Sequence, residues 1–295
     1  MKQGIPVKEK QEYVMNIDDA GVHGEGIGRI EGFTMFVEGA LPGEKVRIRS
    51  VKVGKDHGYG ELMDIIDPSP DRVLPLCPYS KTCGGCTFQH VSYQRQLEFK
   101  TRRVRDALER IGKIGDIKVH DTIGMDNPWR YRNKAQFPVR MGNGLLSIGF
   151  FAPRSHDIVD IDRCIIQHEN GDKVIGIIRD FIQEYNIPVY DERTHRGIIR
   201  HVMTRIGFAT GQIMVVIVTN GRHLPHKDKL ADLLTRSIPD ITSIVQNINS
   251  KKTNVILGNE NITLWGQDHI FDTLAGLTFK ISPLSFYQVN PVQTE

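Results

Sequence analysis

Residues 77–90 read CPYSKTCGGCTFQH, and this stretch organises the rest of the chain. It holds Cys77, Cys83 and Cys86 in a C-x5-C-x2-C pattern. The chain has one further cysteine, Cys164, in the sequence VDIDRCIIQH. Glycines among the first three cysteines let the backbone bend so that their thiolates face one centre. A fourth thiolate from a distant strand would complete the ligand shell and tie the early chain to its middle.

Four interpretations of these cysteines remain open on spacing alone. An iron–sulfur cluster accepts one remote ligand, as ferredoxin spacings show. A zinc site of four cysteines usually has two C-x2-C pairs, and only Cys83 and Cys86 are so spaced. Disulfides require an oxidising compartment, and four unrelated buried thiols would need no ligand at all. The C-x3-C-x2-C spacing of radical-SAM enzymes is absent.

The composition is that of a soluble globular protein. The chain has 295 residues, 39% hydrophobic and 25% charged, which is enough for about two domains with ordinary cores. A net charge of +3 is too small to argue for a nucleic-acid partner, so that argument rests on local basic clusters. The N-terminus has no apolar export core, and the longest aliphatic run, residues 213–218, is too short to cross a bilayer. We therefore expect a cytoplasmic protein with no membrane contact.

The first domain that we expect, residues 1–67, is a small closed β-barrel of OB type. Short strand-like runs alternate there with glycine turns, and the sequence DPSP that follows marks a linker. In KVRIRSVKV, residues 45–53, Val46 and Ile48 alternate with basic residues. The phase then shifts at Ser50, which predicts a β-bulge. The expected strands are residues 12–17, 26–31, 34–37, 45–53 and 60–66.

The outward face of residues 45–53 is basic. Its cations are Lys45, Arg47, Arg49 and Lys52, with Lys55 and His57 in the following turn. Arg47 and Arg49 are candidate contacts to an RNA backbone, with Tyr59 or Phe33 as a surface for base stacking. A solvated strand with ordinary surface charges explains the same pattern.

A helix over residues 92–111 follows the cysteines, with Tyr93, Leu97, Val104, Leu108 and Ile111 along one stripe. Its opposite face carries an i,i+4 ladder of alternating charge, which favours helix stabilisation over RNA contact. The ladder residues are Glu98, Arg102, Asp106 and Arg110.

Residues 127–140, NPWRYRNKAQFPVR, interleave cations with aromatic rings. Arg130, Arg132 and Lys134 are candidate RNA contacts, because phosphates need cations and unpaired bases need rings. A half-buried strand with aromatic core residues would give a similar string. Strands over residues 146–151 and 157–161 follow, and the second gives Cys164 a rigid base.

Residues 68–280 form the second expected domain, of α+β class with a mixed or mostly antiparallel sheet. Apolar residues from Val174 to Tyr185 recur with helical spacing, and another helix is expected over residues 227–236. Further strands are expected over residues 197–206, 212–219 and 243–248, with several short ones up to residue 279. Met203, Met214 and Ile217 are expected in the core.

Several quoted segments together resemble the RNA uracil-5-methyltransferase family, in particular the bacterial 23S rRNA (uracil-5-)-methyltransferases. Residues 18–53, DDAGVHGEGIGRIEGFTMFVEGALPGEKVRIRSVKV, resemble the TRAM domain, an RNA-binding barrel. The segments YRNKAQFPV (131–139) and GFFAPRSHDIVDIDRC (149–164) match this family together with the cysteine pattern. The resemblance implies a [4Fe-4S] cluster bound by Cys77, Cys83, Cys86 and Cys164. It covers essentially the whole chain.

The resemblance also covers SPLSFYQVNPVQTE, residues 282–295. The family has an F-x-Q-V-N motif that opens its Rossmann-like S-adenosylmethionine domain, and its glutamine contacts the cofactor, which assigns that role to Gln288. Asn290 and Pro291 suit the N-cap and first position of a helix, with Gln293 completing a capping box. We expect residues 281–295 to be the start of that domain and the chain to be part of a longer protein.

The implied activity is methylation of uracil C5 in 23S rRNA to give 5-methyluridine, by an enzyme that works as a monomer. The family uses a cysteine thiolate that adds to C6 and makes C5 nucleophilic. Because the cluster uses all four cysteines, we expect no catalytic residue in this chain and no methylation by it alone. The alternatives are a tRNA uracil-5-methyltransferase and a non-catalytic RNA-binding protein held by zinc.

Overall fold

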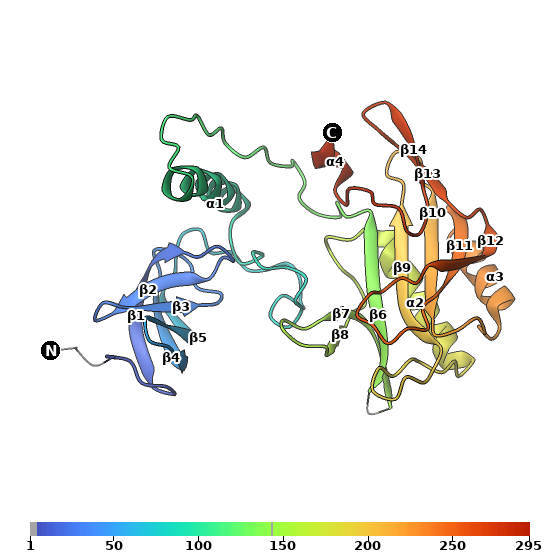
Figure 1. The fold of residues 1–295 in the computed structure, drawn as a ribbon, viewed down its shortest axis with the longest axis horizontal. Coiled ribbons are helices and arrows are strands. Elements are labelled where there is room, and N and C mark those ends of the chain that lie inside the picture. Colours follow the sequence, from blue (N-terminus) through green and yellow to red (C-terminus); the bar gives the residue numbers. More distant parts are fainter. Residues whose placement is uncertain (1–4, 143) are drawn as a thin grey trace. The chain divides into compact units, whose positions relative to one another are not determined.

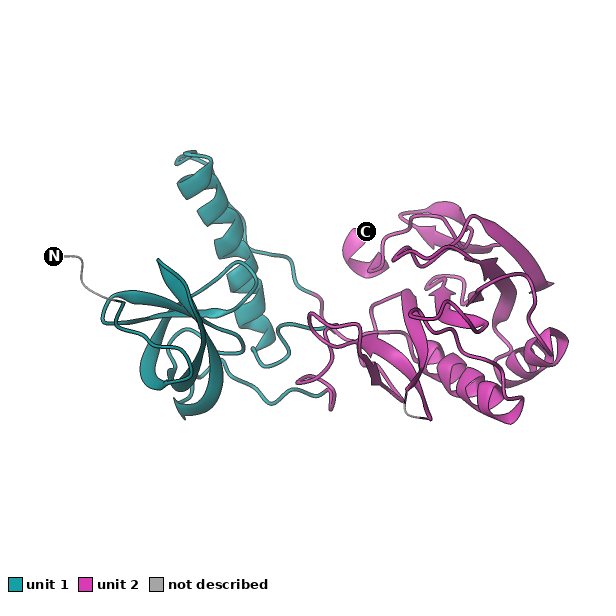
Figure 2. Ribbon diagram, turned by 60° about the horizontal axis from the view of Figure 1, so that its bottom comes forward, with its two compact units in different colours: residues 1–76, 86–124 teal, residues 77–85, 125–295 magenta. Residues whose placement is uncertain are grey.

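The computed structural model describes residues 5–142 and 144–295 and divides into two compact units (Figure 1, Figure 2). Unit 1 comprises residues 1–76 and 86–124, and unit 2 comprises residues 77–85 and 125–295. These limits differ from the expected boundaries after residues 67 and 280. The chain passes from one unit to the other and back, so that the sequence following the cysteines returns to the barrel.

Unit 1 contains the expected five-stranded closed barrel, with strand order β1-β2-β3-β5-β4. Its neighbours pair antiparallel except for β3 and β5, which are parallel. Met35, Val46 and Ile48 are fully buried inside it. The expected irregularity in β4 is confirmed, because its register against β5 shifts between Ser50 and Lys52. The strands are β1 (Glu12–Ala20), β2 (Gly26–Ile30), β3 (Phe33–Val37), β4 (Lys45–Val53) and β5 (His57–Asp67).

Helix α1 (Tyr93–Asp106) belongs to unit 1, and Ser92 caps it by accepting a hydrogen bond from the main chain of Arg95. It ends in a π-helical turn, η1 (Ala107–Ile111). The expected apolar stripe is wrong in its second half, since the side chains of Val104 and Ile111 are 52% and 83% exposed.

Ion pairs connect α1 to the barrel side of unit 1. Arg102 lies 3.2 Å from Asp19, and Arg95 lies 3.5 Å from Asp71. The expected ladder is present in part, through the pairs of Asp106 with Arg102 and Arg110 at 3.7 and 3.3 Å. Arg95 and Arg102 on the basic face of α1 are therefore engaged within their own unit.

Unit 2 is built on a seven-stranded mixed sheet with the order β12-β11-β10-β9-β6-β7-β8. Only β10 and β11 pair in parallel, so the expectation of a mixed, mostly antiparallel sheet is confirmed. A separate hairpin is formed by β13 and β14. The strands are β6 (Lys134–Gly142), β7 (Leu145–Phe151), β8 (Ile158–Asp160), β9 (Ile199–Ile206), β10 (Ile213–Thr219), β11 (Ile241–Ile248), β12 (Glu260–Gly266), β13 (Ile270–Leu274) and β14 (Leu277–Ile281).

Both faces of the central strands are covered, which explains why every residue of β10 is buried. On one face pack α2 (Glu169–Glu184) and α3 (Lys227–Ser237), against a core that includes Phe137 and Ile217. On the other face, Met203 and Met214 pack with Ile270 and Ile281 of the β13–β14 hairpin.

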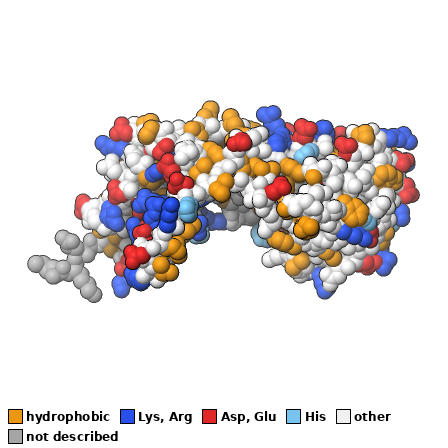
Figure 3. Space-filling model, turned by 90° about the horizontal axis from the view of Figure 1, so that it is seen from above, with side chains coloured by type: hydrophobic (Ala, Val, Ile, Leu, Met, Phe, Trp, Pro, Cys, Tyr) orange, Lys and Arg blue, Asp and Glu red, His pale blue; other side chains and the backbone are white. Residues whose placement is uncertain are grey.

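Surface charge is mixed in sign. On the face drawn in Figure 3, acidic and basic side chains are interspersed. In residues 5–142 and 144–295, no helix combines the length and apolar character that a membrane span requires.

Candidate functional site

The cysteine loop of unit 2, residues 77–85, packs against the end of β7. The N–H of Gly84 donates to the carbonyl of Phe151 at 2.9 Å. A Cβ on Gly84 would lie 2.9 Å from that oxygen and 3.2 Å from the nitrogen of Pro153, so only glycine permits this approach. The hydroxyl of Tyr79 accepts a hydrogen bond from the N–H of Asp162 at 3.2 Å. Residues 77–85 are thereby held close to the segment that carries Cys164.

Main-chain hydrogen bonds also fix the individual cysteines. The N–H of Gly85 donates to the sulfur of Cys83 at 3.4 Å. The N–H of Cys164 donates to Asp172 at 2.9 Å. Cys77, Cys83 and Cys164 are in unit 2, and Cys86 begins the next segment, only two residues beyond Gly84.

None of the four cysteines forms a disulfide, and all are partly exposed. Among the described residues, no group of three or more His, Cys, Asp or Glu side chains is arranged to hold a metal ion. The [4Fe-4S] cluster therefore stays a prediction. It is supported by the four cysteine side chains and by the contacts that hold residues 77–85 near Cys164.

Arg130, one of the expected RNA contacts, has extensive intramolecular partners. Its Nη1 donates to the carbonyls of Cys164 and Gln167 at 2.8 and 3.0 Å and to Asp172 at 2.6 Å. The contact to the carbonyl of Cys164 gives Arg130 a structural role beside a predicted cluster ligand. An additional contact to RNA stays a prediction for this side chain.

Arg132 and Lys134 belong to a group of cations that sequence reasoning identified only in part. Lys134 of β6 lies directly opposite Arg205 of β9 in the antiparallel register. Burial lowers the pKa of Lys134, and the charges of Arg205 and Arg132 lower it further. Among the described residues, none of these three cations has a carboxylate within 4 Å. We refer to Arg132, Lys134 and Arg205 as the cation trio.

The cation trio carries an energetic cost, because like charges directly opposite each other destabilise a sheet. Burial adds to that cost, and the Nε atoms of Arg132 and Arg205 are buried without a hydrogen-bond partner among the described residues. Perturbed charges of this kind concentrate at functional sites. An anion supplied by a ligand would relieve the repulsion.

The cation trio is linked to the segment around Gln288. Nη2 of Arg205 donates to the carbonyls of Pro283 and Ser285 at 3.2 and 2.5 Å. Asn133 lies between Arg132 and Lys134 in the sequence, and its side chain is buried. Its side-chain amide donates to the carbonyl of Gln288 at 2.8 Å. Its main-chain N–H donates to the carbonyl of Val289 at 3.0 Å.

These contacts fix the main chain on both sides of Gln288 while its side chain stays exposed. The short helix α4 (Pro291–Thr294) begins as expected, with the Asn290 side chain accepting from the N–H of Gln293 at 3.2 Å. The role of Asn133 was missed by sequence reasoning, because only the path of the chain after β14 brings Gln288 to it.

Tyr287 gives the same segment a second anchor. Its hydroxyl donates to Asp272 at 3.1 Å, and Asp272 is fully buried. Burial and the nearby carboxylate raise the pKa of Tyr287 to about 12. The phenol therefore stays protonated and keeps this hydrogen bond at any physiological pH.

The two arginines of β4 that are expected to contact RNA differ in their ion pairing. Arg49 lies 3.1 Å from Glu12 and 4.0 Å from Glu61, so its charge is partly compensated. Arg47 is exposed, and no ion pair to it is present among the described residues. It is the stronger of the two candidates for a phosphate.

Tyr59, the expected stacking residue, lies in an aromatic group with Phe36 and His57. The rings of Phe36 and Tyr59 are stacked with centroids 5.7 Å apart, and His57 contacts both edge-on at 5.5 Å. The Tyr59 side chain is 46% exposed. Phe36 was missed, although it faces the same way as Tyr59 across the β3–β5 register.

Comparisons with known proteins agree with these features. The TRAM domain model matches residues 6–63, which include most of the barrel. An uncharacterized RNA methyltransferase of Clostridium tetani is 50% identical over 295 residues, covering 100% of this chain and 64% of the relative. A protein of the same description from Halalkalibacterium halodurans is 48% identical over 294 residues, again covering 64% of its length. The chain thus spans somewhat less than two thirds of these curated relatives.

A solved structure shares the fold. The crystal structure of Pyrococcus abyssi tRNA (uracil-54, C5)-methyltransferase in complex with S-adenosyl-L-homocysteine superposes with a TM-score of 0.72 and 27% identity. The match covers 95% of this chain and 62% of that enzyme. The chain is therefore similar along its whole length to proteins described as RNA methyltransferases, with a TRAM-type barrel at residues 6–63.

Proposed function

We propose that this chain is the RNA-recognition portion of an S-adenosylmethionine-dependent methyltransferase that converts uridine in 23S rRNA to 5-methyluridine. The observation that carries the proposal is the similarity over the whole chain to RNA methyltransferases, at 50% identity to the Clostridium tetani protein. The shared fold with an archaeal enzyme that acts on uracil C5 supports the choice of atom.

Gln288 is the residue of this chain that we assign to the cofactor. Its amide both donates and accepts, so it suits the amino and carboxylate groups of S-adenosylmethionine. Asn133 and Arg205 hold the main chain around Gln288 and leave its side chain exposed, which suits a preorganised contact. The S-adenosyl-L-homocysteine bound to the Pyrococcus enzyme supports a cofactor of this class.

We assign Cys77, Cys83, Cys86 and Cys164 to a [4Fe-4S] cluster. The donor set suits it, because four thiolates are the usual ligands of such a cluster. The close approach of Gly84 to Phe151 and the N–H of Gly85 beside the Cys83 sulfur are features that a cluster-binding loop needs. In this role the cluster is structural and shapes the surface that meets RNA, because methyl transfer involves no redox step.

The reaction at C5 requires a thiolate that this chain has no cysteine left to supply. The thiolate adds to C6, C5 takes the methyl group from the sulfonium, a base removes the C5 proton, and the thiolate then leaves as the C5–C6 double bond returns. The target base must leave its stack for this chemistry. We therefore assign RNA recognition to the chain and predict no methylation by it alone.

Methylation of tRNA is the second candidate, favoured by the substrate of the Pyrococcus enzyme. The presence of the barrel does not separate the two substrates here. The match to that tRNA enzyme covers 95% of this chain, so it extends over most of the barrel.

A two-arm experiment tests the proposal. In the first arm, this chain is titrated against a uridine-containing hairpin of 23S rRNA and against a tRNA transcript, with fluorescence anisotropy as the readout. In the second arm, the natural full-length protein and this chain are incubated with each RNA and methyl-labelled S-adenosylmethionine, and 5-methyluridine is measured by mass spectrometry.

We expect tighter binding to the rRNA hairpin, 5-methyluridine formed on rRNA by the natural full-length protein only, and no product from this chain. Product formed on tRNA instead selects the second candidate. Absence of RNA binding by the chain contradicts the proposal itself, as does a zinc-loaded protein whose full-length form yields no 5-methyluridine.

A further inference from the structure

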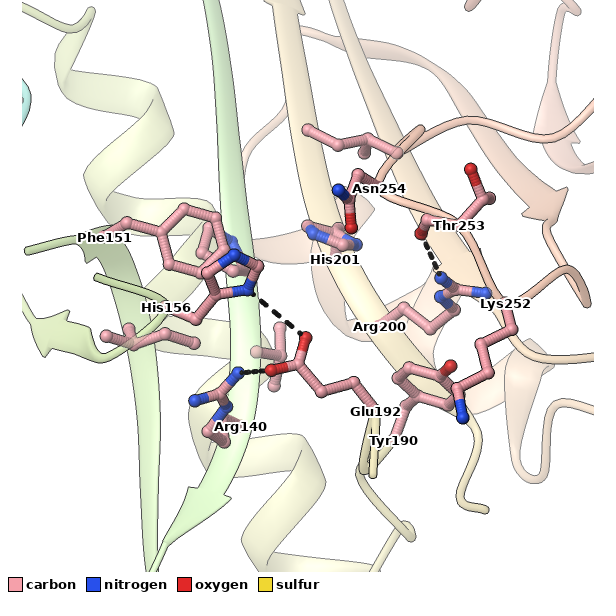
Figure 4. A pocket seen from close by; sticks show the side chains of 14 residues that line it. Arg140, Phe151, His156, Tyr190, Glu192, Arg200, His201, Lys252, Thr253 and Asn254 are labelled. Carbon is pink, nitrogen blue, oxygen red and sulfur yellow. Dashed lines mark hydrogen bonds and ion pairs between the residues drawn. The ribbon is translucent and has the colours of Figure 1, made fainter. Parts of the chain in front are cut away.

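Unit 2 contains a pocket that none of the roles above uses (Figure 4). Its volume is about 520 Å³, which is within the range of pockets that bind small molecules or single nucleotides. The walls come from β6, from the end of β7, from the starts of β8 and β9, from the segment of residues 190–192 and from the loop of residues 252–256. No cysteine lines it, and neither does Gln288.

Arg200 forms a fixed positive wall of this pocket. It is only 4% exposed, and its Nη1 donates to the carbonyls of Asn249 and Lys251 at 2.5 and 2.8 Å. The guanidinium also lies over the ring of Tyr190, 4.3 Å from its centroid. Among the described residues, no carboxylate lies within 4 Å of Arg200, so its charge is held in place without an anionic partner.

The remaining charges leave the pocket electropositive. Arg140 donates to Glu192 at 2.6 Å, and His156 lies 3.7 Å from the other oxygen of the same carboxylate. Lys252 is exposed at the mouth, and no ion pair to it occurs among the described residues. Three permanent cations therefore face one carboxylate, which favours an anionic ligand.

The same walls offer surfaces for a planar, neutral ring. The rings of Phe151 and His156 lie 5.7 Å apart at the entrance. Deeper in the pocket, burial and the charge of Arg200 lower the pKa of His201 to about 4, so its imidazole is neutral at physiological pH. Its Nδ1 is buried with no hydrogen-bond partner among the described residues. The amide of Asn254 adds a donor and an acceptor.

The position of the pocket on the sheet connects it with the cation trio. Pro138 pairs with His201, and Lys134 pairs with Arg205, in one antiparallel register. Residues four apart on a strand lie on the same face, about 13 Å apart along it. The pairs Pro138–His201 and Lys134–Arg205 therefore lie on the same face of the β6–β9 pair.

We propose that this pocket holds one unpaired nucleotide of the RNA substrate, with its base against Phe151 and His156 and its phosphate at Lys252. The inference rests on the proposed RNA-recognition function and adds a second anchoring point to it. An unpaired base that is stacked on a ring and hydrogen-bonded along its edge is how proteins read single-stranded RNA. A phosphate at the mouth would supply the anion that Arg200 and Lys252 lack.

Two neighbouring lysines give a matched test. Lys252 lines the pocket, whereas Lys251 does not, although both side chains are exposed on the same loop. Lys251→Ala keeps the main-chain carbonyl that Arg200 uses. The chain and the variants Lys252→Ala and Lys251→Ala are titrated with a fluorescein-labelled RNA that has an unpaired uridine-containing loop, at several salt concentrations.

We expect Lys252→Ala to lower the slope of log K against log salt by about 0.7 and to weaken binding about fivefold at 0.1 M salt. Lys251→Ala should stay within about twofold of the original chain. Phe151→Ala should weaken binding at least about fivefold without changing the slope, because it removes stacking and no charge. Fluorescence of the two tryptophans, both in unit 2, checks that the variants fold.

The outcomes distinguish this inference from the proposed function. If the chain binds RNA and the two lysine variants behave alike, the pocket inference is overturned while RNA recognition stands. If uridine or adenosine 5′-monophosphate shifts the NMR signal of His201 but Lys252→Ala leaves RNA affinity unchanged, the pocket takes a free nucleotide and the inference fails. Failure of the chain to bind any RNA overturns both.

Discussion

Replacing Lys134 with methionine should make unit 2 more stable and its RNA binding weaker. Methionine keeps the apolar stem of the side chain and removes the charge that faces Arg205 across the β6–β9 pair. Removing a like-charge pair from a sheet is worth about 0.2 to 1 kcal/mol, and the partial burial of Lys134 adds to the gain. We therefore expect a rise of about 1 kcal/mol in the free energy of unfolding of unit 2.

RNA affinity should change in the opposite direction. If Lys134 contacts one phosphate, its loss lowers the salt slope by about 0.7 and weakens binding about fivefold at 0.1 M salt. Stability is measured by urea unfolding followed by tryptophan fluorescence, and affinity by anisotropy with the rRNA hairpin. Lys227→Met, on an exposed position of α3 across the sheet, serves as the control and should change neither quantity appreciably. A destabilised Lys134→Met variant with unchanged RNA affinity would refute the reasoning.

Two further substitutions test the pocket and the cysteine loop. Because the pKa of His201 is about 4 in the fold against 6.5 in the unfolded chain, the folded state binds fewer protons between these values. Stability should be complete above pH 6.5 and fall by up to roughly 3 kcal/mol as the pH drops towards 4. His201→Asn should flatten that part of the profile in urea unfolding at each pH, whereas His156→Asn, on an exposed side chain, should keep it. Gly84→Ala should destabilise unit 2 by about 1 to 3 kcal/mol, since its Cβ meets the main chain of Phe151. A Cβ on Gly176, inside α2, would meet nothing within 4 Å, so Gly176→Ala should instead raise the free energy of unfolding by about 1 kcal/mol. Equal effects of the two glycine substitutions in urea unfolding would contradict the packing argument.

Local patterns predicted the elements of this fold well where burial follows the period of the backbone. The alternation around Val46 and Ile48 predicted both limits of β4, and the apolar pattern of residues 212–219 predicted the strand β10 to within one residue. The same reasoning failed for the end of α1. Val104 and Ile111 have helical spacing, but no other element of the described chain covers them.

Features that depend on pairing between distant segments were not accessible from the sequence. The opposition of Lys134 and Arg205 follows from the β6–β9 register, and the hydrogen bond from Asn133 to Gln288 depends on the path of the chain after β14. Residues 86–124 belong to the barrel unit, in which the ion pair of Arg102 with Asp19 joins segments far apart in the sequence. The sequence therefore predicts which residues carry charged or polar groups. It does not predict which residues from distant segments lie beside them.

The cluster assignment is tested most directly by measuring iron, acid-labile sulfide and zinc in the chain after purification without oxygen. We predict about four iron and four sulfide per chain, with the broad visible absorbance of a [4Fe-4S] cluster, and loss of both in Cys83→Ser. Stoichiometric zinc without sulfide, or a metal-free protein in which the cysteines form two disulfides, would contradict the account.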